Sequence, residues 1–114
     1  MHAFLVQHDQ HFDITWNLDA SVGRGGQNSN RTDVSFVQWY YTLAAESALT
    51  PQDRREIYRA VKVTGSCRGT DDDPLVRAIL AHQRALNHPV VDGRVSVARP
   101  GVKVGENAFF ILRL

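Results

Sequence analysis

The sequence predicts a small, mostly helical α+β domain, in which three helices form the core and short peripheral strands lie near both termini. Its 114 residues suit one domain with one modest core. Hydrophobic residues make up 43% of the chain and charged residues 22%, close to the average of soluble globular proteins. Apolar residues recur at helical spacing in three central stretches and form short runs near both ends. We therefore treat residues 1–114 as a single domain.

Two short strands are expected at the N-terminal end. Residues 3–6 form an apolar run, and residues 12–16 alternate between apolar and polar side chains. Residues 8–11 between them are typical of a turn, so a hairpin is the simplest arrangement. Residues 17–31 then predict a loop, because their glycines and asparagines accept left-handed backbone conformations.

The first two helices have recognisable starts. The first should begin near Thr32, whose hydroxyl can cap it, with Asp33 favourable in the first turn. The second should begin at Thr50 as the N-cap, because Pro51 suits the first helical position. Gly65 is a residue at which this second helix can end.

The third helix is expected to begin at Asp73, which can cap it, with Pro74 at the first helical position. Pro89 stops this helix, because proline cannot continue the backbone hydrogen bonding. A turn at residues 92–93 should follow. Strands are then expected at residues 95–97 and 109–112, the second of them buried.

Charge and hydropathy exclude two classes of partner. The formal net charge is +1 and the arginines are scattered, which argues against a nucleic-acid partner. No apolar stretch is long enough to insert into a membrane, and the run at residues 3–6 is too short for a signal peptide. We expect a chain that is cytoplasmic when made and that reaches the periplasm or cell wall only by a non-Sec route.

Catalytic and metal sites are weakly indicated. His8 and His11 have a spacing that can chelate zinc, but a structural site needs four ligands, and an exposed hairpin tip is the simpler interpretation. Cys67 with His82 as its base lacks an orienting group and a signature around the thiol, so both are interpreted as packing residues. We expect no catalytic residue, no metal and no cofactor.

The glycine-rich stretch at residues 21–28 precedes a helix. Backbone N–H groups at such a position can bind phosphate. The stretch contains neither Gly-Lys-Ser/Thr nor the spacing of a dinucleotide-binding fingerprint. A structural turn is therefore the favoured interpretation.

Four aromatic residues gather in the first helix. Tyr41 shares a helical face with Val37, Phe36 shares the next face with Tyr40, and Trp39 lies elsewhere. A buried helix explains this pattern most simply. The alternative is a partly exposed platform, because aromatic rings stack well on sugar faces.

Three short motifs follow one another along the chain. Asp-Val-x-x-Val-Gln spans residues 33–38, Ala-Ile-x-x-His-Gln spans residues 78–83, and Asp-Gly-x-Val spans residues 92–95. This order resembles the peptidoglycan-binding-like domain family over roughly residues 16–95. The Ser-Val-Gly-x-Gly-Gly-x-Asn lead-in at residues 21–28 is similar to its effector-type and phage-lysin-type branch, including members linked to type VI secretion. His82 stands where the family usually has Phe.

The resemblance implies a peptidoglycan-binding-like three-helix core and a non-catalytic module that holds an effector or a wall hydrolase at peptidoglycan. A protein-interaction or loading domain of a type VI secretion system, without glycan binding, is the alternative. The candidate ligand contacts are four loop residues and two aromatic residues of the first helix: Arg24, Gln27, Asn28, Asn30, Trp39 and Tyr40.

Overall fold

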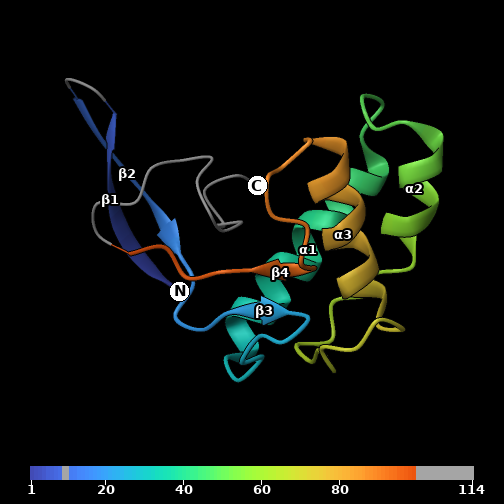
Figure 1. Ribbon diagram of the computed structural model, residues 1–114, viewed down its shortest axis with the longest axis horizontal. Coiled ribbons are helices and arrows are strands. Elements are labelled where there is room, and N and C mark those ends of the chain that lie inside the picture. The colour runs from blue at the N-terminus through green and yellow to red at the C-terminus, as the bar shows by residue number, and fades with distance from the viewer. Residues whose placement is uncertain (9–10, 100–114) are drawn as a thin grey trace.

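The computed structural model describes residues 1–8 and 11–99, and it confirms the small α+β domain. Three helices and four short strands occur in this part of the chain (Figure 1). In chain order they are β1 His2–His8, β2 His11–Asn17, β3 Val22–Gly23, α1 Arg31–Glu46, α2 Gln52–Arg59, α3 Pro74–Ala85 and β4 Arg94–Val95.

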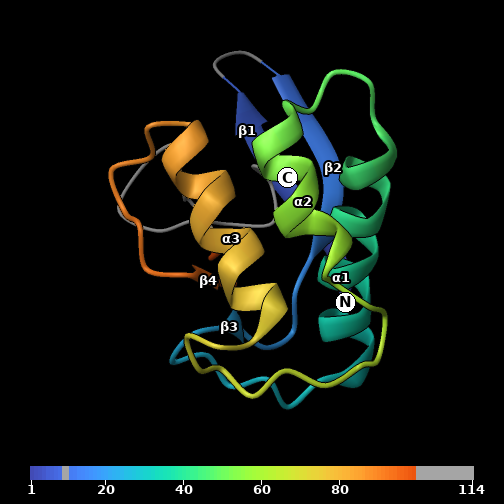
Figure 2. The same ribbon diagram turned by 90° about the vertical axis from the view of Figure 1, so that its right-hand side faces the viewer.

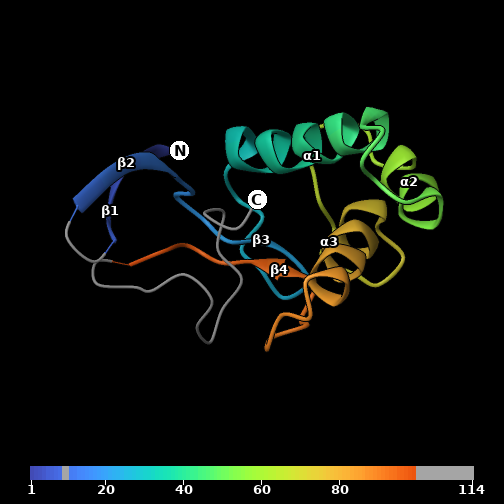
Figure 3. The same ribbon diagram turned by 90° about the horizontal axis from the view of Figure 1, so that it is seen from above.

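The predicted N-terminal hairpin is confirmed. Strands β1 and β2 pair in antiparallel register, from His2 opposite Asn17 to His8 opposite His11. The hairpin extends away from the three helices in two perpendicular views (Figures 1 and 3). Residues 9–10 of the expected turn lie outside the described residues.

A second, smaller sheet joins the loop after the hairpin to the end of the described chain. Val22 of β3 pairs with Val95 of β4, and Gly23 pairs with Arg94. Gly23 has a φ of +116°, and a Cβ atom there would lie 2.2 Å from the carbonyl oxygen of Gly93. Only glycine therefore fits this crossing.

The C-terminal strands differ from the prediction. Strand β4 covers Arg94–Val95, so the strand predicted at residues 95–97 begins earlier and is shorter. Its backbone turns away toward Asn17, whose side chain bonds both the N–H and the C=O of Ala98. The strand predicted at residues 109–112 lies outside the described residues.

The core lies between the three helices and the β3–β4 sheet. Helix α2 contacts both α1 and α3, and Figure 2 shows it between them. Burial of these apolar side chains supplies the main favourable free energy of folding. The largest fully buried apolar side chains are Leu18, Val22, Val34, Val37, Tyr41, Leu75, Val76, Ile79 and Val95.

The cap of α1 is Asn30, and the prediction of Thr32 as the first cap was wrong. The Asn30 Oδ1 atom accepts a hydrogen bond from the Asp33 N–H at 3.0 Å, which satisfies a free donor of the first turn. Thr32 is exposed and lies inside the helix. Asp33 is in the first turn, as expected.

The bounds of α2 also differ from the prediction. Pro51 is the N-cap, and Thr50 instead donates its hydroxyl to the Ala44 carbonyl at 2.8 Å. The helix ends at Arg59, well before Gly65. The Gly65 N–H is bound by the side chain of Gln38, which holds this segment outside a helix.

The predicted start of α3 is confirmed. Asp73 is the N-cap, its Oδ1 atom accepts from the Leu75 N–H at 2.8 Å, and Pro74 occupies the first helical position. The helix ends at Ala85, before Pro89. The described helices include none that is both long and apolar enough to cross a membrane.

Replacing Asn30 with Ala should lower the free energy of unfolding by about 1 kcal/mol, because the first turn of α1 loses its cap. Thr32→Ala is the matched control, and it should change this free energy by less than about 0.5 kcal/mol. Urea unfolding measures both. Equal losses in the two variants would contradict the assignment of Asn30 as the cap.

Candidate functional site

The glycine-rich loop is held closed by one side chain. Asn28 has a φ of +52°. Its Oδ1 atom accepts from the Gly23 N–H at 2.8 Å, and its Nδ2 atom donates to the carbonyls of Gly23 and Gly26 at 3.0 and 3.3 Å. The Asn28 side-chain amide therefore stabilises the loop itself. This agrees with the interpretation of residues 21–28 as a structural turn.

Arg24 ties the same loop to two distant turns. Its Nε atom donates to the Asp92 carbonyl at 3.0 Å, and its Nη1 atom donates to Asp71 Oδ1 at 2.9 Å. Gln27 has an exposed side chain, and its backbone N–H donates to the Ser21 hydroxyl. Of these two ligand candidates, Gln27 is the one directed to solvent.

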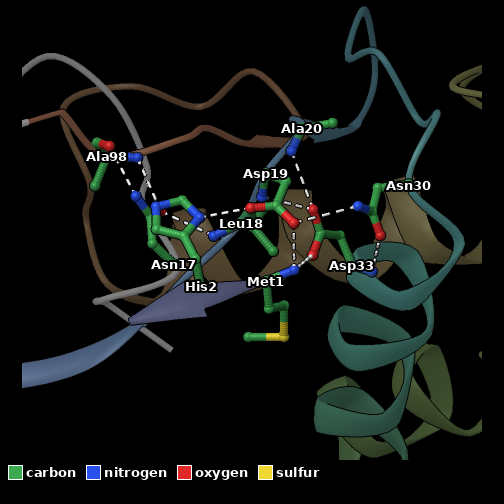
Figure 4. Close-up of polar contacts among 9 residues, drawn as sticks. All are labelled: Met1, His2, Asn17, Leu18, Asp19, Ala20, Asn30, Asp33 and Ala98. Carbon is green, nitrogen blue, oxygen red and sulfur yellow. Dashed lines mark hydrogen bonds and ion pairs between the residues drawn. The ribbon is translucent and has the colours of Figure 1, made fainter. Parts of the chain in front are cut away.

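A buried carboxylate joins the start of α1 to the chain before it (Figure 4). Asp33 is fully buried, and its Oδ2 atom accepts from the N–H groups of Asp19 and Ala20 at 2.7 and 3.0 Å. Its Oδ1 atom lies 2.8 Å from the α-ammonium nitrogen of Met1. This ammonium also donates to Asp19 Oδ2 at 2.6 Å, and the Asn30 amide reaches the same oxygen at 3.4 Å. The buried negative charge is thus compensated on both oxygens.

The Met1 ammonium and the Asp19 carboxylate shift each other's pKa. Hydrogen bonds to Asp19 and then Asp33 raise the pKa of the Met1 ammonium above its ordinary value of 8.0. Hydrogen bonds from the ammonium and then from His2 lower the pKa of Asp19 below 3.8. The ammonium therefore contributes stability that is fully present below about pH 8 and is lost as the pH rises through its raised folded-state pKa.

Gln38 of α1 uses its whole carboxamide to hold the chain after α2. Its Oε1 atom accepts from the N–H groups of Thr64 and Gly65, both at 2.9 Å. Its Nε2 atom donates to the Thr64 hydroxyl and the Ser66 carbonyl at 3.1 and 3.0 Å. A buried amide whose oxygen and nitrogen are both hydrogen-bonded contributes to a unique fold.

Gln83 of α3 does the same for the turn before β4. Its Oε1 atom accepts from the Gly93 N–H at 2.9 Å. Its Nε2 atom donates to Asp92 Oδ1 and the Arg94 carbonyl at 3.0 and 3.3 Å. Gly65 and Gly93 both have positive φ values, +77° and +72°, so each glutamine holds a left-handed glycine turn.

The aromatic cluster of α1 divides into an inner and an outer part. Tyr41 is fully buried with its hydroxyl 3.0 Å from His82 Nδ1, and Tyr40 stacks on the same imidazole with ring centroids 5.8 Å apart. Trp39 is 49% exposed and lies beside Phe36, with ring centroids 6.0 Å apart. Trp39 and Tyr40 therefore do not form one exposed platform.

Leu43 belongs to the outer part and was missed by the sequence reasoning. It follows Trp39 by four residues, shares its helical face and is also 49% exposed. We call the exposed Trp39 and Leu43, with the partly buried Phe36 beside them, the outer face of α1. The i, i+3 and i, i+4 spacing of Phe36, Trp39 and Leu43 places them on one helical face, but the spacing does not show whether that face is buried.

The two packing interpretations hold for the core residues. His82 is buried between Tyr40 and Tyr41, and Cys67 packs against the core. Burial raises the pKa of the Cys67 thiol, so the thiol stays protonated at neutral pH. No cluster of three or more metal-ligating side chains occurs among the described residues.

The six ligand candidates thus have unequal surroundings. Asn28 and Asn30 bond to the loop and the helix start, Arg24 bridges two turns, and Tyr40 packs on α3. Gln27 and Trp39 present the most solvent-exposed side chains of the set.

No protein-family model, curated protein or solved structure that was compared with the chain matches it.

Removing the Gln83 carboxamide should strongly destabilise the fold. Gln83→Leu leaves the Gly93 N–H buried without its acceptor, so the free energy of unfolding should fall by about 1–3 kcal/mol. Gln52→Leu is the control, because Gln52 is exposed on α2 and should change stability by less than about 0.5 kcal/mol. Equal chemical-denaturation midpoints for the two variants would refute the role of Gln83.

Raising the pH above about 8 should reduce stability, because the unfolded chain then loses the Met1 ammonium proton before the folded chain does. The loss should be smaller in Asp33→Asn, which weakens the ammonium site. The stability of both chains is measured in a Cys67→Ala background. The raised pKa of the Cys67 thiol would otherwise also lower stability as the pH rises. Parallel stability curves between pH 7 and pH 10 in the two chains would count against the ammonium contact.

Proposed function

We propose that this chain is a non-catalytic module that binds bacterial peptidoglycan, and that the outer face of α1 makes the contact. The observation that carries the proposal is the exposed indole of Trp39, 49% exposed on a helix whose other side is fully buried. An aromatic ring in this position is available to stack on a sugar face. The resemblance of the three motifs to peptidoglycan-binding-like domains supports the same ligand.

The loop before α1 offers polar side chains for such a ligand. Gln27 is exposed and its side chain can bond hydroxyl and carboxylate groups. The Arg24 side chain is 41% exposed while its guanidinium pairs with Asp71. The proposed site therefore combines one aromatic surface with polar groups near the start of the same helix.

A second candidate is a protein-interaction or loading domain of a type VI secretion system. Trp39 and Leu43 favour it, because exposed aromatic and leucine side chains one helical turn apart also suit the apolar centre of a protein interface. The two candidates share the outer face of α1 and differ in the ligand.

Co-sedimentation with insoluble peptidoglycan separates them. The wild-type chain should pellet saturably, and Trp39→Ala should raise the apparent Kd at least about tenfold, the loss typical of a central aromatic contact. Leu49→Ala is the control, because Leu49 is 93% exposed in the α1–α2 connection and is not one of the residues of this face. A folded wild type that stays in solution would refute wall binding and leave the loading domain as the better candidate.

A further inference from the structure

The turn before β4 contains the only Asp-Gly pair in the sequence, Asp92–Gly93. Gly93 has a φ of +72°, and a Cβ atom there would lie 3.2 Å from two side-chain atoms of α3. Asp92 Oδ1 accepts hydrogen bonds from the Arg94 N–H and from Gln83 Nε2, both at 3.0 Å. The structure of the turn therefore selects a glycine directly after an aspartate.

An Asp-Gly pair can rearrange, because glycine has no Cβ atom to hinder attack of its backbone nitrogen on the aspartate side chain. The Gly93 nitrogen bonds to Cγ of the protonated Asp92 side chain, a Cγ–O bond breaks, and water leaves with the amide proton. A second water molecule then opens the succinimide ring. When it breaks the bond between the nitrogen and the original main-chain carbonyl carbon, the product is isoaspartate. The rearrangement needs no reactant besides water.

The Gln83 carboxamide binds both groups that would react. Its Oε1 atom accepts from the Gly93 N–H at 2.9 Å, and its Nε2 atom donates to the Asp92 carboxylate. The Arg94 N–H binds the same carboxylate at 3.0 Å, and the Arg94 guanidinium lies 3.4 Å from it. Gln83 is fully buried on α3, so these contacts are anchored in the core. Rotation of the carboxylate toward the Gly93 nitrogen would break them.

Arg24 restrains the backbone of the same pair. Its N–H donates to the Gly93 carbonyl at 2.8 Å, and its Nε atom donates to the Asp92 carbonyl at 3.0 Å. Ring closure requires rotation about the bonds between the two reacting groups, and these contacts oppose that rotation. The Asp92 side chain is 28% exposed, so water can reach it. Restraint of the turn, rather than exclusion of water, therefore decides whether the rearrangement occurs.

We propose that Asp92 is a modification site that is closed in the folded chain and that forms isoaspartate when the Gln83 contacts open. The product cannot rebuild the same turn, because its main chain is longer by one methylene group. The side-chain carboxylate that accepts from Gln83 and Arg94 becomes a peptide group, and the carbonyl that accepts from Arg24 becomes part of a free carboxylate. Because the turn leads into β4, whose Val95 is fully buried, the change should loosen this side of the core.

Prolonged incubation of the purified chain near neutral pH tests the proposal. Isoaspartate at residue 92 is measured by peptide mapping with mass spectrometry, using a protease that cleaves before aspartate but not before isoaspartate. The folded chain should isomerise at least about tenfold more slowly than the same chain in guanidinium chloride, because its turn must first open locally. Equal rates in the folded and unfolded chains would overturn the proposal, and this comparison needs no variant.

Two variants test whether Gln83 provides the protection. Gln83→Leu removes both of its contacts to the pair, so isoaspartate at Asp92 should form at least about tenfold faster than in the wild type. Gln38→Leu is the matched control, because it removes an equivalent buried carboxamide from the Gly65 turn and leaves the Asp92 turn bonded. Gln83→Met, with an unbranched side chain, takes the place of Gln83→Leu if the leucine variant does not fold. Equal acceleration by the Gln83 and Gln38 variants would overturn the proposal, because general loss of stability would then explain both.

The consequence for the fold is measured on the modified chain itself. The isoaspartate form is separated from the unmodified wild type by chromatography, and both are unfolded in urea. The modified chain should have the lower denaturation midpoint, because the turn that leads into β4 is altered. Identical midpoints would contradict the predicted loosening of the core. No wall material is present in these experiments, so their results are independent of peptidoglycan binding.

Discussion

This fold depends on buried glutamine carboxamides that satisfy the backbone of glycine turns. Gln38 holds the turn around Gly65, and Gln83 holds the turn around Gly93. Gln38 belongs to α1 and Gln83 belongs to α3. Each side chain therefore fixes its glycine turn to that helix. The Gly93 turn leads directly into β4, which pairs with β3. The Gly93 carbonyl also accepts a hydrogen bond from the Arg24 N–H.

The two glutamines of the sequence motifs have parallel roles, and both side chains are buried. Asp33 and Gln38 of the first motif, and Gln83 of the second, are buried and bonded within the domain. Gln38 and Gln83 have the same structural role, because each binds the backbone of a glycine turn. A ligand would therefore meet side chains other than Asp33, Gln38 and Gln83, and Trp39 on the outer face of α1 is the most exposed aromatic side chain of that helix.

Local signals in the sequence predicted the parts of the fold that depend on neighbouring residues. The hairpin followed from alternation, and the start of α3 followed from Asp73 and Pro74. The cap of α1 was not predicted correctly, because Asn30 and Thr32 are both good caps by type. The Asn30 amide also contacts Asp19 Oδ2 at 3.4 Å, a tertiary contact that the local sequence does not reveal.

The candidate site was predictable only in part, for a similar reason. Helical spacing placed Trp39 on a different face from Tyr41. Tyr40, however, is covered by His82 of α3, a helix that is far along the sequence but adjacent in space. Strand alternation likewise defined two hairpin faces without telling which one points outward. Loop composition suggested ligand contacts at Asn28, whereas its left-handed backbone and internal bonds give it a structural role.

Chemical-shift mapping by NMR with soluble peptidoglycan fragments tests the central claim most directly. We expect saturable shifts for the Trp39 indole and for the backbone of the outer face of α1. The Gln38 and Gln83 side-chain amides, which are bonded inside the domain, should not shift. Shifts centred on the Gly93 turn and the Gln83 amide, or no shifts in a folded chain, would contradict it.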